Sequence, residues 1–195
     1  MGRTGEVERK TKETDIRVSL ELDGPGKSEI DTGIGFFDHM LEGFAKHGFF
    51  DLKLSCRGDL DVDCHHTVED CGIALGEAIK KAVGDKAGIS RYGSFMLPMD
   101  DALIACAVDL CGRPYYSSDV VFPQEICGEM EMDVLKEFFY AVSYSGLMNL
   151  HFKMFSGDNS HHIAEACFKA FAKALDMALK KDSRIGDVLS TKGTL

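Results

Sequence analysis

The chain has 195 residues, of which 45% are apolar and 28% are charged. This composition predicts a globular domain and excludes a wholly disordered chain. Lysine and arginine number 22 against 32 acidic residues, and the net charge of −10 argues against nucleic acid or an anionic membrane as a partner. No apolar run approaches the roughly 20 residues that a membrane helix needs. The seven cysteines form no CxxC pair, which predicts free thiols in a reducing cytoplasm.

In the first half of the chain, strand and helix patterns alternate. Every second residue over 15–22 is apolar, which predicts a half-buried strand, and Asp23-Gly24-Pro25-Gly26 predicts the turn that follows. We expect a helix from Phe36 to a glycine turn at Gly48, and then a strand over 52–56. After a short loop, apolar residues at helical spacing predict an amphipathic helix that begins near 65.

The second half shows the same kinds of element. Apolar runs over 102–110 and 115–121 predict strands, separated by Gly112-Arg113-Pro114. A helix is expected from 133 to Gly146, followed by a strand over 150–154 and an amphipathic helix that begins near 161. The polar tail over 183–195 is expected to be ordered only if something holds it.

The order of these elements indicates an internal duplication. Gly48 and Gly146 are 98 positions apart, and the pairs His65-His66 and His161-His162 are 96 positions apart. Two copies are too few for a solenoid. We therefore predict an α+β fold, an internally duplicated βα sandwich with pseudo-twofold symmetry. Its halves are residues 1–88 and residues 89–195 with the tail, packed into one compact domain.

The motif HHxxE occurs once in each copy. It is formed by His65, His66 and Glu69 in the first copy and recurs in the second as His161, His162 and Glu165. Residues three and four apart share a helix face, so a carboxylate and a histidine can reach one ion. Adjacent histidines diverge by about 100°, so each pair is expected to serve two ions. One such motif is compatible with ordinary exposed histidines, whereas two equivalent copies favour metal binding.

The duplication adds one more ligand to each copy. His39 lies nine positions before Gly48, and Glu137 lies nine positions before Gly146. Both are residue types that bind metals, and both lie on the first helix of a copy. The resulting nitrogen and oxygen donors suit Mn²⁺, Fe²⁺ or Zn²⁺. The sequence leaves open how two ions divide the eight ligands, which are His39, His65, His66, Glu69, Glu137, His161, His162 and Glu165.

Several basic residues are candidates for an anion site in this acidic chain. Lys169 follows Glu165 by four positions, so it lies on the ligand face of the helix, one turn further on. Arg91 and Arg113 stand beside glycines at element boundaries, and Lys192 lies in the tail. Arginine and lysine together commonly bind phosphate, although each of these charges alone is compatible with a solvated surface.

Further motifs accompany these residues in a fixed order along nearly the whole chain. They are Arg9-Lys10-Thr11-Lys12-Glu13-Thr14, Phe37-Asp38-His39-Met40-Leu41, His65-His66-Thr67-Val68-Glu69-Asp70, Arg91-Tyr92-Gly93, Gly112-Arg113-Pro114, Asn159-Ser160-His161-His162, Phe168-Lys169-Ala170 and Ser190-Thr191-Lys192-Gly193. With them the chain resembles the imidazoleglycerol-phosphate dehydratase family of histidine biosynthesis. No Rossmann or P-loop glycine pattern competes with this resemblance.

The resemblance implies a fold, a reaction and an assembly. The halves are expected to resemble domain 2 of ribosomal protein S5. The reaction is the dehydration of imidazole glycerol phosphate to imidazole acetol phosphate, with two Mn²⁺ ions per active site and no organic cofactor. The subunits are expected to form a homo-oligomer of 24 chains in the cytoplasm, with active sites between subunits.

The resemblance also assigns roles to residues. Glu13 is the first candidate for acid–base work, and Glu165 is a metal ligand that could share it. The phosphate-side positions are His47, Arg91, Arg113, Lys169, Ser190 and Lys192. Three positions depart from the pattern: Gly43 stands where many members have glutamine, Glu137 where many have histidine, and Asp101 where glutamate is common.

Two other functions are compatible with the ligands alone. A di-metal phosphate-ester hydrolase would use the same side chains to activate water and would release phosphate from simple esters. A metal-storage or assembly module would use the ions only to join subunits, and would then tolerate changes at Glu13 and Lys169.

Overall fold

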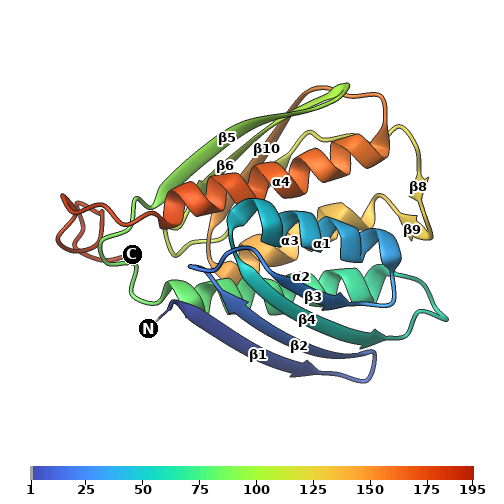
Figure 1. Cartoon of the computed structure of the whole chain (residues 1–195), viewed down its shortest axis with the longest axis horizontal. Coiled ribbons are helices and arrows are strands. Elements are labelled where there is room, and N and C mark those ends of the chain that lie inside the picture. The colour runs from blue at the N-terminus through green and yellow to red at the C-terminus, as the bar shows by residue number, and fades with distance from the viewer. Residues whose placement is uncertain (1) are drawn as a thin grey trace.

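The computed structural model describes residues 2–195, which form two four-stranded sheets (Figure 1). The first sheet has the order β1-β2-β4-β3, and the second has the order β5-β6-β10-β7. In each sheet one edge strand, β3 or β7, runs parallel to its neighbour, whereas the other pairs are antiparallel. The strands are β1 (Thr4–Lys10), β2 (Thr14–Glu21), β3 (Ser28–Asp31), β4 (Asp51–Gly58), β5 (Tyr92–Met99), β6 (Ala102–Asp109), β7 (Tyr115–Ser118) and β10 (Asn149–Ser156).

Four helices fill the space between the two sheets (Figure 1). They are α1 (Gly35–Gly48), α2 (His65–Val83), α3 (Val134–Gly146) and α4 (Ser160–Leu179). Helix α2 packs on β1 and β2 and against α3, while α4 packs on β5 and β6 and against α1. The rings of Phe37, Phe138 and Phe168 meet at the centre, with centroids 5.2 Å apart for Phe37–Phe138 and for Phe138–Phe168. The helices therefore share one apolar core that draws on both halves.

The two halves have the same topology, so the predicted duplicated α+β fold is confirmed. Each contains a hairpin, a short third strand, a helix, a strand and a second helix, in that order. The correspondence extends to single backbone angles. Phe49 and Leu147, 98 positions apart, both end the first helix of their half in the left-handed conformation, with φ of 58° and 51°.

The strand predictions were partly wrong. The sequence patterns did not indicate β1, β3 or β5, nor the small hairpin β8 (Ile126–Cys127) and β9 (Met130–Glu131). The strand expected over 115–121 ends at Ser118, because the Ser118 hydroxyl accepts a hydrogen bond from the Val120 backbone N–H and turns the chain.

The C-terminal tail is held against the linker between the halves. Arg91 donates from Nη1 to the Leu189 carbonyl at 2.8 Å, and the Gly88 N–H donates to the Asp187 carbonyl at 3.0 Å. Ile89 and Lys181 form an isolated antiparallel bridge. The tail is therefore fixed at the end of the molecule where α4 finishes. Within residues 2–195, no helix is long and apolar enough to cross a membrane.

Candidate active site

Three side chains from both halves converge where α4 begins. His39 comes from α1, and His161 and Glu165 come from the first turns of α4; their donor atoms all lie within 4.8 Å of one another. The Nε2 atom of His161 is 3.6 Å from Oε2 of Glu165, and the His39 and His161 ring centroids are 5.8 Å apart. Two nitrogens and one carboxylate oxygen at this spacing fit Mn²⁺, Fe²⁺ or Zn²⁺. Among the described residues it is the only group of three with this spacing.

Polar side chains accept hydrogen bonds at the start of the two helices that carry the histidine pairs, α2 and α4. The Asn159 side chain accepts hydrogen bonds from the backbone N–H groups of His161 and His162, at 2.9 and 3.4 Å. In the other half, the Asp63 carboxylate accepts from the His65 N–H at 2.7 Å. Such caps satisfy donors that the first turn leaves free. The two histidine pairs are thereby held in the first turn of their helices.

The equivalent group, on α2 and α3, has a wider spacing. His65 Nε2 lies 3.4 Å from Oε2 of Glu69 on α2, and Glu137 lies on the neighbouring helix α3. These three residues correspond by the repeat to His161, Glu165 and His39. They do not meet the 4.8 Å spacing of the other group.

The second histidine of each pair points elsewhere. The rings of His65 and His66 are 6.1 Å apart and nearly perpendicular, at 80°, and those of His161 and His162 are 6.2 Å apart at 79°. His66 contacts Asp59, and His162 contacts Asp101. Each carboxylate raises the pKa of its histidine through this hydrogen bond. The expected divergence of adjacent histidines is thus present in both halves.

A basic cluster adjoins the α4 group. Lys169 Nζ lies 2.6 Å from Oε1 of Glu165, and both side chains are mostly buried. Burial opposes ionisation of Glu165, but the hydrogen bond and charge of Lys169 outweigh it and lower the pKa of that carboxyl. Burial and the charges of Lys169 and Lys173 lower the pKa of His47 at the end of α1. An anion placed here would meet several positive groups.

Four of the predicted phosphate-side residues lie at the opposite end of the molecule from the metal ligands. The Arg91 N–H donates to the Ala178 carbonyl in the last turn of α4, whereas His161 is in its first turn. These positions are about 25 Å apart at 1.5 Å per residue. Arg91 is paired with Asp109 at 2.7 Å, and the tail with Ser190 and Lys192 docks beside it. Arg113 also lies at this end, where its carbonyl accepts from the Asn149 side chain at the start of β10.

Glu13 lies in the turn between β1 and β2. Its charge contributes to the raised pKa of His66 at the start of α2. The turn is shaped by Thr11, whose hydroxyl accepts from the N–H groups of Glu13 and Thr14 at 3.1 and 3.0 Å.

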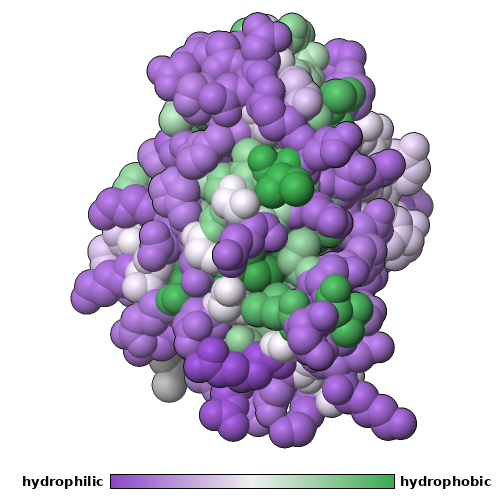
Figure 2. All heavy atoms as spheres, turned by 90° about the vertical axis from the view of Figure 1, so that its right-hand side faces the viewer, coloured by the Kyte–Doolittle hydropathy of each residue, from purple (hydrophilic) through white to green (hydrophobic). Residues whose placement is uncertain are grey.

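The face at which the helices begin is not uniformly polar. Figure 2 shows apolar side chains gathered at its centre and surrounded by hydrophilic ones. The loop before α2 exposes Leu60 and Val62, and the segment that leads into β8 exposes Val121. An apolar area beside candidate metal ligands is typical of a surface that contacts another protein.

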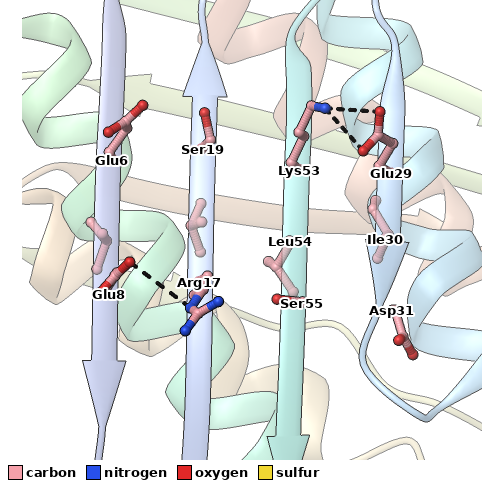
Figure 3. Close-up of a pocket in the computed structure, with 12 residues that line it drawn as sticks. Glu6, Glu8, Arg17, Ser19, Glu29, Ile30, Asp31, Lys53, Leu54 and Ser55 are labelled. Carbon is pink, nitrogen blue, oxygen red and sulfur yellow. Dashed lines mark hydrogen bonds and ion pairs between the residues drawn. The ribbon is translucent and has the colours of Figure 1, made fainter.

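A large pocket lies elsewhere, on the outer face of the first sheet. It has a volume of about 820 Å³ (Figure 3). Its charged groups pair within the sheet: Lys53 Nζ is 2.9 Å from Glu29, and Arg17 is 3.9 Å from Glu8. None of the sequence-predicted site residues lines it. The candidate site is therefore the group at the helix N-termini and not this pocket.

Sequence reasoning missed the two aspartates that contact His66 and His162. Asp59 is in an acidic loop and could have been found from its position just before the HHxxE motif. Asp101 is a departure from the family pattern, and the structure places its carboxylate against the His162 ring. That contact depends on how the β5–β6 turn packs over the start of α4, which the sequence pattern does not reveal.

The fold and this cluster define a duplicated α+β protein with a histidine–carboxylate group able to hold a metal ion. The family model of imidazoleglycerol-phosphate dehydratase matches residues 32–175. The chain belongs to the imidazoleglycerol-phosphate dehydratase family, and the resemblance inferred from its motifs is confirmed.

Relatives and solved structures of the family are similar over nearly their whole length. The dehydratase of Lachnoclostridium phytofermentans is 61% identical, and that of Acetivibrio thermocellus is 56% identical, each over 100% of both chains. The crystal structure of the dehydratase from Staphylococcus aureus has a TM-score of 0.83 at 35% identity, covering 92% of this chain and 99% of that one. The structure of the Pyrococcus furiosus enzyme in complex with (S)-C348 has a TM-score of 0.84 at 38% identity, covering 97% and 100%.

Proposed function

We propose that this chain dehydrates imidazole glycerol phosphate to imidazole acetol phosphate, as a hydro-lyase of histidine biosynthesis, with two Mn²⁺ ions per active site. The observation that carries the proposal is the convergence of His39, His161 and Glu165 in a chain of this family. The related proteins described above are all dehydratases, so the alternative of a phosphate-ester hydrolase has no support.

The ligand geometry supports one division of the eight ligands. One ion would be held by His39, His161 and Glu165, and the other by the equivalent Glu137, His65 and Glu69. His66 and His162 diverge from these groups by nearly a right angle, so each would bind the ion of a neighbouring subunit. When bound, the ions act as Lewis acids on the imidazole ring and as a template for the substrate.

The remaining chemistry falls to the chain's own carboxylates. The reaction removes a proton from carbon, and the hydroxyl leaves with a proton as water; the resulting enol then becomes the ketone. A carboxylate must accept the carbon-bound proton, and a positioned acid must donate to the departing hydroxyl. Glu13 is the proposed acid–base residue because the family resemblance assigns it this role and its charge acts on His66 at the start of α2. Glu165 is proposed as a ligand that shares this work.

The phosphate group would be bound by two sets of residues. Lys169 and His47 lie beside the α4 group in the same chain. Arg91, Arg113, Ser190 and Lys192 lie at the far end, so a second subunit would supply them. This separation supports a homo-oligomer, proposed as 24 chains, that works without nucleic-acid or membrane partners. The seven free thiols, six of them buried, support a cytoplasmic location.

The proposal is tested with metal-stripped protein and imidazole glycerol phosphate, with and without Mn²⁺. We expect the enolisable ketone to form only when Mn²⁺ is added. Failure to form it with any divalent metal, in protein that still binds two ions per chain, would overturn the proposed function. Inorganic phosphate, measured in the same samples, reports hydrolysis and should not appear.

A further inference from the structure

Two histidines of the site donate their ring proton to an aspartate. His66 Nδ1 lies 3.0 and 3.2 Å from the two carboxylate oxygens of Asp59, and His162 Nδ1 lies 2.5 Å from Oδ1 of Asp101. A carboxylate accepts hydrogen bonds but has no proton to give, so Nδ1 carries the proton in both contacts. The same ring atom is thus engaged in both halves.

The two aspartates come from different parts of the repeat. Asp59 lies in the loop between β4 and α2, whereas Asp101 lies in the turn between β5 and β6. When β4 is aligned with β10 by the 98-residue spacing of the repeat, Asp59 corresponds to Gly157. Glycine has no side chain that could contact the histidine. The second half makes the contact from its hairpin instead. The shared contact is therefore not a simple copy of the duplicated sequence.

A proton fixed on Nδ1 determines what the other nitrogen can do. The neutral ring then presents the lone pair of Nε2, the form in which imidazole binds a metal ion. The hydrogen bond also fixes the angle of the ring about its bond to Cβ. Without it, an exposed histidine would divide its time between tautomers and ring orientations.

We propose that Asp59 and Asp101 are positioning residues that hold the Nδ1–H tautomers of His66 and His162, so that Nε2 of each ring faces a metal ion. This inference rests on the proposed function, because it assumes that His66 and His162 are ligands. It assigns neither aspartate to the reaction itself. Removal of such a carboxylate behind a metal-binding histidine typically weakens metal binding by about 10–100-fold.

The two aspartates differ in what else they hold. Asp101 Oδ2 also accepts from the backbone N–H groups of Asp158 and Asn159, at 2.5 and 2.9 Å, and Asn159 caps α4. Changing Asp101 therefore disturbs the start of the helix as well as the ring. The Asp59 side chain makes no further hydrogen bond within residues 2–195. Asp59 gives the cleaner test.

The test measures metal binding in Asp59→Ala, Asp59→Asn and Asp101→Asn. Free Mn²⁺ is followed by electron paramagnetic resonance, and the visible absorption of added Co²⁺ reports the geometry of the ligands. We expect Asp59→Ala to bind Mn²⁺ about 10–100-fold more weakly and to change the Co²⁺ spectrum. Asp59→Asn retains a carbonyl acceptor for the Nδ1–H group, so it should recover part of the affinity.

Matched controls remove the same charge nearby: Asp61 lies in the loop of Asp59, and Asp158 lies in the loop before α4 that contacts Asp101. Asp61→Asn is the control for Asp59, and Asp158→Asn is the control for Asp101; neither side chain contacts a histidine in the described structure. Both should keep the wild-type Mn²⁺ affinity. If Asp59→Ala and Asp61→Asn weaken Mn²⁺ binding equally, the effect comes from the charge of the loop, and the inference is overturned.

The outcomes separate this inference from the proposed function. If wild-type protein binds no Mn²⁺, the proposed function fails and the inference fails with it. If wild-type protein binds Mn²⁺ and forms the ketone, but Asp59→Ala keeps its affinity and Co²⁺ spectrum, only the positioning role is wrong. Should Asp101→Asn unfold, as judged by circular dichroism, the Asp59 variants alone decide the result.

Discussion

The two groups of candidate ligands occupy equivalent places in the duplicated fold, yet they differ in charge. The group on α1 and α4 has two histidines and one carboxylate, and Lys169 neutralises that carboxylate. The group on α2 and α3 has one histidine and two carboxylates, and the position equivalent to Lys169 is Ile73. Duplication preserved the scaffold while the electrostatics of the two groups diverged. We expect an anionic substrate to turn its phosphate toward the α4 group.

The two helix pairs that join the halves, α2 with α3 and α1 with α4, also differ in how they pack. A side-chain carbon added to Gly72 would lie 2.7 Å from the Phe138 carbonyl, so the backbones of α2 and α3 are in close approach. In α4 the equivalent position is Phe168, whose ring separates the helices and stacks on Phe138. One pair of helices therefore meets through glycine, and the other meets through an aromatic core.

The largest expected loss of activity follows a change in the turn of the β1–β2 hairpin, where Glu13 lies. Glu13→Gln should lower kcat by about 10²–10⁴-fold, because it removes the proposed acid–base group, and should leave Mn²⁺ content unchanged. The corresponding turn of the other half carries Asp100, 3.5 Å from His162 Nε2, and Asp100→Asn should have a smaller effect. Steady-state kinetics with metal analysis of both variants decides this. Equal losses would mean that the two turns act alike.

The ligands that most distinguish the groups are His39 and Glu137. We expect His39→Ala and Glu137→Ala each to lose one of two bound ions, because each removes a direct ligand from one group. Glu137→His gives the α2 and α3 group the composition of the other one and should keep both ions. Metal analysis after dialysis measures the stoichiometry. Two ions retained in His39→Ala would remove that residue from the ligand set.

Lys169 is expected to act on phosphate binding rather than on metal binding. Lys169→Ala should raise KM by about 10-fold, as expected for loss of a hydrogen bond between charged groups, while kcat changes less. Ile73→Ala is the matched control at the equivalent position and should leave KM unchanged. Kinetics and metal content are measured together. Loss of metal in Lys169→Ala would mean instead that Lys169 supports Glu165.

The smallest expected effect is on stability. Gly43 lies within α1, and a side-chain carbon added there meets no atom within 4 Å. Gly43→Ala should therefore raise the free energy of unfolding by about 1 kcal/mol, the cost of glycine in a helix interior. Gly72→Ala in α2 is the opposing control, because it would clash with the Phe138 carbonyl. Denaturant unfolding measures both, and a destabilised Gly43→Ala would contradict this account.

The sequence predicted those features that the duplication repeats at fixed spacing. The helices that carry His65 and His161, and the pairing of His39 with Glu137 as equivalent positions, follow from the repeat. The strand β3, which the sequence patterns did not indicate, has four residues, too few to show a clear alternation. The proximity of His39 to the ligands on α4, rather than to those on α2, depends on how the halves pack. The contacts of Asp59 and Asp101 depend on loop geometry, which residue spacing does not encode.

The ligands of the α1 and α4 group come from both halves of the chain. This has a consequence for why the two halves are joined in a single chain. A free copy of one half could supply His39, or else His161 and Glu165, but never the three together. Two separate halves would have to meet by diffusion before the three ligands could bind one ion together. The short linker between α2 and β5 replaces that encounter with a local concentration in the millimolar range. Covalent fusion thus makes the group independent of how much protein a cell contains.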